Sequence, residues 1–447
     1  MDVGWVLRKA EDIWNRFWGK NMEKSIWETL PDVAMIEIFK LLRDPDKANL
    51  ALTCTNWARL FHTPSLWRNR HFDMGGYKSH TNGVRANKFA EQFGAYVENL
   101  SITCSHPSYH ITKVFQKSME DLLVKFRTSQ LKEFEMERLE LDRFWKHDSA
   151  RDRFTNNFVK FFKTQKRLKV FDMTAAQCPL NGGLKIMEVI GQKSGKTMEE
   201  IYIEDFFPSR FTVYSVEKFK IAISYFTNLS YVALNYNYIS EEIIEIFSKT
   251  LAGKLKFFNI KVYRSNPHLH RISSFAWRHL TSICPNLQVM FWFDSVARST
   301  EIIPILVPEI PVQDVHIWTG YEDDAEWNLS DTITHIADSN VATLEAASLE
   351  LDNNQEFVDD AVLYLVNKCK RLFDLSLNAA VLLSTIETIL EQVDERKSNL
   401  RSLHITACGL SEMEWTELGV IKDRFADMAT SRNIDLNIST DLVLDPF

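Results

Sequence analysis

The sequence contains little glycine and little proline, 14 and 12 residues of 447. Collagen-like repeats and low-complexity linkers are rich in one or both of these residues, so both classes are excluded. The six cysteines are scattered and form no Cys-x-x-Cys pair. This usage disfavours a zinc site or a disulfide framework and favours a reducing compartment. We therefore expect no metal site and no cofactor.

The sequence also lacks an apolar run of about eighteen residues, so we expect no transmembrane helix and no membrane partner. Its first residues lack the apolar core of a signal peptide. The net charge of −8 is modest and has the wrong sign for a typical nucleic-acid-binding protein. Together these features predict a cytoplasmic or nuclear protein that binds no nucleic acid.

Apolar residues make up 45% of the chain, which is long enough for several domains or one repeat array. Residues 1–24 predict an amphipathic helix, because Trp14 and Trp18 share one face. We expect this helix to pack beside the next segment or on a partner; a membrane-surface helix is the alternative. Gly75-Gly76 and Asn82-Gly83 are turn signals, so residues 71–94 are predicted to be a connector.

Residues 30–67 carry a dense helical pattern. Apolar residues recur at three-residue steps, at Val33, Ile36, Phe39 and Leu42. Asp44-Pro45-Asp46 then ends one helix and starts the next. A segment of about forty residues buries little surface alone, so we expect it to dock on something. It is either a helical cap on the neighbouring domain or a module that binds a partner.

The same segment resembles the F-box, through Leu30-Pro31, Ile38-Phe39, Leu42, Asp46, Leu50, Cys54, Trp57 and Leu66-Trp67. It departs from the family at Lys47 and Thr53, where apolar residues are usual. The resemblance implies a three-helix module within residues 25–70 that binds a Skp-type adaptor and, through it, a cullin scaffold. The residues expected to contact the adaptor are Leu30, Pro31, Ile36, Phe39, Leu42, Trp57 and Trp67; the two tryptophans could instead be core.

A short motif then repeats along the rest of the chain, with apolar residues at its first, fourth and sixth positions and starts 25 to 37 residues apart. Such self-similarity predicts a solenoid over residues 95–447, in which each unit is a strand, a loop and a helix. Ordinary α/β strands in a closed sheet are the alternative. The starts are Val97, Leu131, Leu168, Met198, Leu229, Leu255, Leu287, Val312, Leu344, Leu372 and Leu400, with a partial copy at Ile434.

These units resemble divergent leucine-rich repeats of the kind found behind F-boxes. The resemblance implies an α/β solenoid with parallel strands on its concave side and helices on its convex side, preceded by the all-α F-box module. It also implies a substrate-recognition subunit of an SCF-type ubiquitin ligase that is itself no enzyme. No catalytic motif is present in the sequence to suggest otherwise. A repeat scaffold that binds proteins without ubiquitin transfer is the alternative.

Alternation along a strand places the third, fifth and seventh motif positions on the concave face. Acids there would repel one another, which a basic ligand would relieve, and exposed aromatic residues often mark binding surfaces. We therefore expect a protein substrate with basic residues beside apolar anchors. Loops folded over the aromatic residues, or a strand out of register, are the alternatives. The predicted substrate-binding residues are Glu133, Glu135, Glu137, Asp172, Tyr202, Glu204, Tyr231, Phe257, Phe291, Phe293, His316 and Trp318.

Overall fold

The computed structural model describes residues 30–440, except 105–108, 145–146, 321–326 and 354–355. The helix expected at residues 1–24 lies outside the described residues. The chain divides into two compact units, Met1–Thr197 (unit 1) and Met198–Phe447 (unit 2). In the described part of the chain, none of the helices combines the length and apolar character that crossing a bilayer requires.

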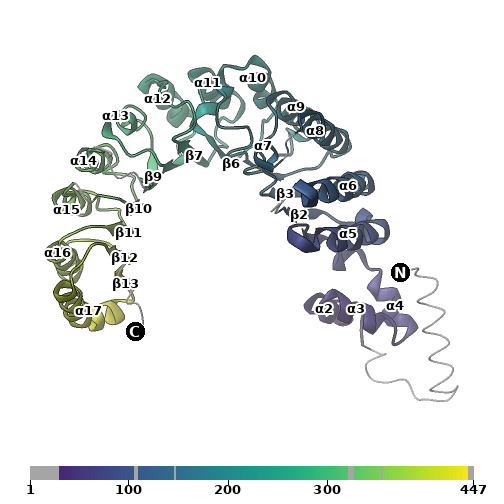
Figure 1. Ribbon diagram of the computed structural model, residues 1–447, viewed down its shortest axis with the longest axis horizontal. Coiled ribbons are helices and arrows are strands. Elements are labelled where there is room, and N and C mark those ends of the chain that lie inside the picture. Colours follow the sequence, from purple (N-terminus) through teal and green to yellow (C-terminus); the bar gives the residue numbers. More distant parts are fainter. Residues whose placement is uncertain (1–29, 105–108, 145–146, 321–326, 354–355, 441–447) are drawn as a thin grey trace. The chain divides into compact units, whose positions relative to one another are not determined.

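The described part of unit 1 starts with three short helices and continues with strands that alternate with helices (Figure 1). Its first three strands pair in parallel in chain order, and β4 pairs with β3. The elements are α2 (Asp32–Leu41), α3 (Asp44–Ala51), α4 (Thr55–Phe61), β1 (Asn69–Asp73), α5 (Ser79–Phe93), β2 (Asn99–Thr103), α6 (Tyr109–Lys125), β3 (Glu133–Glu137), α7 (Leu141–Phe144), α8 (Asp148–Phe162), β4 (Val170–Asp172) and α9 (Leu180–Ser194).

Unit 2 repeats the same alternation, and its strands pair in parallel in chain order. The elements are β5 (Glu200–Tyr202), α10 (Glu217–Ser224), β6 (Tyr231–Asn235), α11 (Glu241–Thr250), β7 (Phe257–Tyr263), α12 (Ser274–Ile283), β8 (Gln288–Asp294), α13 (Ser299–Ile302), β9 (Val312–Trp318), α14 (Leu329–Ser339), β10 (Ala346–Glu350), α15 (Asp359–Lys368), β11 (Asp374–Ala379), α16 (Leu383–Asp394), β12 (Ser402–Ala407), α17 (Glu412–Arg432) and β13 (Asp435–Thr440).

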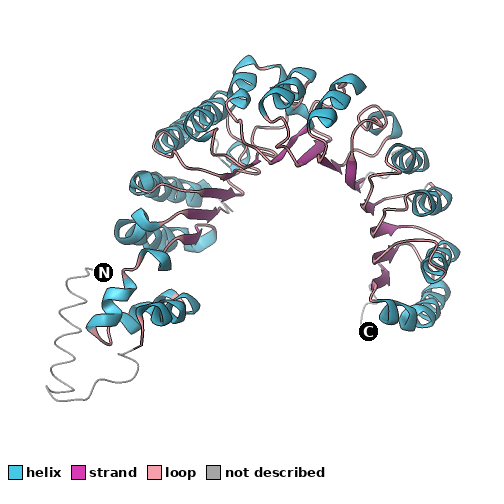
Figure 2. Cartoon of the chain, turned by 180° about the vertical axis from the view of Figure 1, so that it is seen from behind, coloured by secondary structure: helices cyan, strands magenta, loops and turns pink. Residues whose placement is uncertain are grey.

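The core of each unit lies between the strands and the helices. On β7, Phe258, Ile260 and Val262 are buried, whereas Asn259 and Lys261 between them face outward. Within unit 2 the strands line the inner side of a bend and the helices its outer side, as Figure 2 shows from behind. One strand and one helix cannot enclose an apolar face, so each repeat depends on its neighbours. The predicted α/β solenoid behind a helical module is confirmed, with a strand at every predicted start.

The helical module docks on the first repeat of unit 1. Phe39 and Trp67 are buried in one core cluster with Phe93 of α5. The rings of Trp67 and Phe93 stack with centroids 4.4 Å apart, and the indole N–H of Trp67 donates to the carbonyl of Phe61 at 2.7 Å. The module and the first repeat therefore share one core.

Residues 71–94 do not form the expected connector, because they contribute most of β1 and all of α5. The turn predicted at Asn82-Gly83 is wrong, since both residues lie inside α5. A Cβ atom on Gly83 would lie 2.5 Å from Oγ of Ser118 in α6. This glycine allows two helices to approach closely rather than the chain to turn.

Two substitutions in α2 distinguish a core position from a surface position. We expect Phe39→Ala to lower the free energy of unfolding by about 3–5 kcal/mol, because it leaves a cavity in the shared core. Val33→Ala should change it by less than about 0.5 kcal/mol, because Val33 is 72% exposed. Urea unfolding measures both values. Equal effects would contradict the placement of α2.

Candidate functional site

The first candidate surface is the outer face of α2. Val33 and Leu41 are 72% and 88% exposed, and neither is among the predicted adaptor contacts. Of the predicted contacts, Pro31 is exposed, and Leu30, Ile36, Leu42 and Trp57 are partly buried.

The prediction of surface contact is wrong for Phe39, and for Trp67 the structure favours the core, which was the stated alternative. Both are buried, with exposed fractions of 0% and 2%, in the core shared with α5. Spacing along the helix identifies apolar residues but does not divide them between the core and a partner.

Lys47, a departure from the F-box pattern, is explained by the packing around Trp67. Its side chain is buried, its amine lies 5.3 Å from the centre of the Trp67 ring, and it is 3.5 Å from the Asp44 carboxylate. Arg70 pairs with the same carboxylate and lies over the Phe89 ring. Burial opposes ionisation of Asp44, but Arg70 and Lys47 together hold its pKa below the ordinary value.

The second candidate surface is the strand face of unit 1, which holds four of the five predicted acids. Glu133, Glu135 and Glu137 alternate along β3, and Glu135 is directly opposite Asp172 of β4. Burial raises the pKa of Glu135, and the charges of Asp172 and Glu137 raise it further. A hydrogen bond from Ser101 acts in the opposite direction but does not cancel the rise. Burial also raises the pKa of Asp172. The cluster therefore carries adjacent carboxylates that resist ionisation.

This cluster predicts a pH-dependent stability. Because both pKa values are raised, the folded chain holds these protons more tightly than the unfolded chain does. The stabilisation is complete below the ordinary pKa of about 4 and is lost as the pH rises through the folded-state values. A double variant with Glu135→Gln and Asp172→Asn should therefore unfold at higher urea concentration than the wild type at pH 7.5, with a difference that shrinks toward pH 4.

Glu133→Gln is the matched control, since this exposed carboxylate lies on the same strand without the contact to Asp172. It should leave the midpoint unchanged. If the double variant behaves like this control at pH 7.5, the proposed strain between the carboxylates does not exist.

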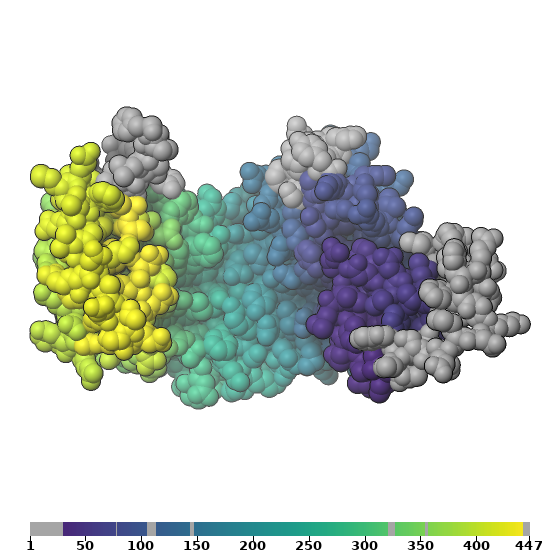
Figure 3. Space-filling view, turned by 90° about the horizontal axis from the view of Figure 1, so that it is seen from below, coloured from purple at the N-terminus to yellow at the C-terminus, as the bar shows by residue number. Residues whose placement is uncertain are grey.

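The third candidate surface is the strand face of unit 2, visible for its early repeats as the teal surface in Figure 3. Tyr202, Tyr231 and Phe257 form a row across β5, β6 and β7, with ring centroids 4.8 and 5.9 Å apart. Phe257 is 39% exposed, and the two tyrosines are partly exposed. His316 and Trp318 lie on the same face of β9, each partly exposed. The predicted aromatic face is present at these positions.

The placement of Phe291 and Phe293 on this face is wrong, because both are buried. In the sheet Phe258 pairs with Val289 and Ile260 with Phe291. Phe258 comes three residues after Leu255, whereas Val289 comes only two residues after Leu287, so the motif that starts at Leu287 is offset by one residue. The one-residue offset turns every side chain of β8 to the opposite face. Trp292, which is 49% exposed, is the aromatic residue that β8 presents.

A hollow of about 220 Å³ lies on the unit 2 face, and we call it the strand-face pocket. Phe291 and Ile260 are its buried members. Trp292 and the His316 ring meet edge to face at its side, with centroids 5.3 Å apart. The remaining lining residues are Glu204, Asn259, Lys261, Met290 and Asp314. Of the lining residues, sequence reasoning named only Glu204, Phe291 and His316, although Asp314 occupies a third motif position.

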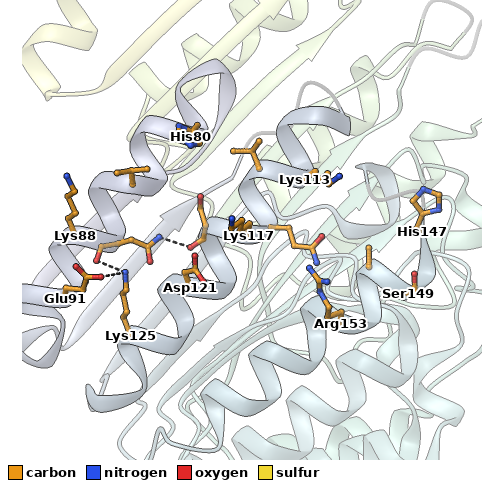
Figure 4. Close-up of a pocket in the computed structure, with 16 residues that line it drawn as sticks. His80, Lys88, Glu91, Lys113, Lys117, Asp121, Lys125, His147, Ser149 and Arg153 are labelled. Carbon is orange, nitrogen blue, oxygen red and sulfur yellow. Dashed lines mark hydrogen bonds and ion pairs between the residues drawn. The ribbon is translucent and has the colours of Figure 1, made fainter.

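A larger hollow of about 1110 Å³ lies among α5, α6 and α8 of unit 1 (Figure 4). Its lining is rich in basic side chains, which are Lys88, Lys113, Lys117, Lys125 and Arg153. Lys125 pairs with Glu91 at 2.6 Å, and Arg153 pairs with Glu120 at 3.1 Å. The other three lysines are exposed to solvent. This arrangement is that of a solvated helix surface.

Comparison with protein families places these surfaces in context. A family model described as F-box-like matches residues 27–73. The match includes α2, α3 and α4 and ends with β1. The chain carries an F-box-like domain. The resemblance stated from Leu30-Pro31 to Leu66-Trp67 is therefore confirmed.

One relative of this chain is named for an F-box and leucine-rich repeats. F-box/LRR-repeat protein 21 from Mus musculus is 21% identical over 277 residues, which cover 60% of this chain and 59% of the relative. The chain thus matches less than two thirds of that relative's length. In this chain the F-box-like domain at residues 27–73 precedes the repeating strands and helices.

Two solved structures show a remote likeness. The leucine-rich repeat-containing protein LegL7 from Legionella pneumophila has a TM-score of 0.40 and 10% identity, covering 72% of this chain and 97% of its own. A chain of the TLR13–ssRNA13 complex has a TM-score of 0.33 and 8% identity, covering 82% of this chain and 51% of its own.

Proposed function

We propose that this chain is a non-catalytic substrate receptor of an SCF-type ubiquitin ligase. In this role the F-box-like domain binds a Skp-type adaptor and, through it, a cullin scaffold, while the repeats bind a protein substrate. Such a receptor needs no chemistry of its own, because it raises the concentration of substrate beside a separate enzyme. The role fits the cytoplasm or the nucleus.

The observation that carries the proposal is the division of apolar residues in the F-box-like domain. Phe39 and Trp67 are used inside the chain, whereas Val33 and Leu41 point to solvent from the same short helix. Exposed apolar side chains in a cluster commonly mark a protein interface. We therefore add Val33 and Leu41 to the predicted adaptor contacts and keep Leu30, Pro31, Ile36, Leu42 and Trp57 among them.

A charge-introducing double variant tests the proposal. Val33→Asp with Leu41→Asp should reduce the adaptor recovered with the tagged chain at least about ten-fold, about 1.4 kcal/mol, because unpaired carboxylates would be buried at the interface. The measurement is affinity purification from cells followed by quantification of the adaptor and the cullin. Val420→Asp is the matched control, since Val420 of α17 is also exposed but lies in unit 2.

Recovery of the adaptor with the wild-type chain and with Val420→Asp, but not with the double variant, is the expected result. Failure of the wild-type chain to recover any adaptor would contradict the proposal. Recovery of other proteins through the repeats without adaptor or cullin would instead favour a scaffold without ubiquitin transfer.

A further inference from the structure

The geometry of the strand-face pocket assigns it a ligand class: we infer that it binds one basic side chain, lysine or arginine, of a partner polypeptide. The inference rests on the proposed function, since the partner would be the substrate. It names a specific anchor point on the repeats, formed by Asn259, Trp292 and Asp314, with His316 at its side.

Two oxygen acceptors in the pocket lack partners. The Asp314 carboxylate has no hydrogen bond or ion pair among the described residues, and the only charge found to act on it is that of Asp374. Oδ1 of Asn259 is buried and also has no hydrogen-bond partner within the described chain, while its amide nitrogen donates to the hydroxyl of Tyr231. Buried acceptors without donors are costly and are usually satisfied by a ligand or by water.

The cation already in the pocket does not satisfy these acceptors. The amine of Lys261 lies 2.9 Å from the Asp205 carboxylate and 3.3 Å from that of Asp294. Burial disfavours its charge, but these two acids together raise its pKa. Lys261 is therefore held by its own pair of acids, and the charge of Asp314 remains uncompensated.

The shape of the pocket suits a long cationic side chain. Trp292 remains 49% exposed although the Lys261 amine already lies 5.1 Å from the centroid of its ring. Indole rings bind ammonium and guanidinium groups favourably. Met290 lines the approach with apolar surface. On the neighbouring strand β10, Ala346 lies opposite Asp314 and Ser348 lies opposite His316. Their small side chains leave the pocket open. Asp314 and Asn259 both line this pocket, so their oxygens supply acceptors to a donor-rich head group that enters it.

The charge state of the pocket gives a second observable. Burial, with the charge of Asp374, raises the pKa of Asp314 to about 6. Burial lowers the pKa of His316, against the charges of Glu350 and Asp294. Glu204 and Lys261 also line the pocket. Protonation of Asp314 below pH 6 should therefore weaken the binding of a cation, and protonation of His316 acts in the same direction.

The experiment compares three peptides of the form Gly-Leu-Xaa-Leu-Gly with arginine, lysine or neutral citrulline at the central position. Each is titrated by calorimetry into the full chain at pH 7.5. We expect arginine or lysine to bind at least ten-fold more tightly than citrulline, and Asp314→Asn to abolish this preference. Asp374→Asn is the matched control, because it removes a nearby charge from the same face without altering the pocket lining.

Stability separates a binding role from a structural one. Because the pKa of Asp314 is raised, its ionisation destabilises the fold as the pH rises from about 4 through 6, so Asp314→Asn should raise the melting temperature at pH 8. Loss of peptide preference together with a higher melting temperature supports the inference. Trp292→Leu, a second variant at a half-exposed position, should also weaken binding of the basic peptides.

Equal binding of citrulline and arginine peptides, or equal loss of preference in Asp314→Asn and Asp374→Asn, would overturn the inference. The inference would also be overturned if Asp314→Asn lowered the melting temperature and Trp292→Leu kept the peptide preference. None of these measurements involves the adaptor. Peptide preference without adaptor recovery would therefore refute only the proposed function, and adaptor recovery without peptide preference only the pocket.

Discussion

The stacking of Trp67 on Phe93 is the contact on which the arrangement of unit 1 depends. A solenoid repeat buries its apolar face only against a neighbour, so the first repeat needs a cover on its outer side. The helical module supplies this cover with Met35, Phe39, Leu60, Leu66 and Trp67, which join Phe93 in one core. Among the large apolar side chains of the module that the structure describes, Val33 and Leu41 are left the most exposed to another protein.

The strand faces of the two units differ in what they offer. Unit 1 presents adjacent carboxylates on β3 and β4, and unit 2 presents a row of aromatic rings beside a small pocket. At Glu135, Asp172 and Asp314 the pKa is raised, because burial disfavours the charged carboxylate. Residues that oppose folding stability in this way are expected where a surface is selected for binding rather than for stability.

Much of this fold could be predicted from sequence, because strand alternation and the spacing of repeats are local patterns. The strands that begin after Val97 follow from apolar residues at fixed intervals. The sequence pattern does not indicate the first strand, because Arg70 occupies a core position in β1, opposite Leu100. Its charge is tolerated there through Asp44 and the ring of Phe89, neither of which is near it in sequence.

The candidate sites could be predicted less well, because they depend on register and on packing between distant segments. Counting from Leu287 placed Phe291 and Phe293 outward, whereas the pairing with β7 turns them inward and presents Trp292. The apolar stripe of α2 likewise gives no sign that Phe39 packs toward Phe93. The Asp314 carboxylate lacks a hydrogen-bond partner among the described residues because of which side chains surround it in the fold, and no sequence motif indicates this.

Hydrogen–deuterium exchange of the full chain, alone and with a purified Skp-type adaptor, tests the central claim most directly. The account predicts slower exchange over residues 30–42 on addition of the adaptor, with α5 and the strand faces unchanged. Unchanged exchange over residues 30–42, or protection confined to the strands of unit 2, would contradict it.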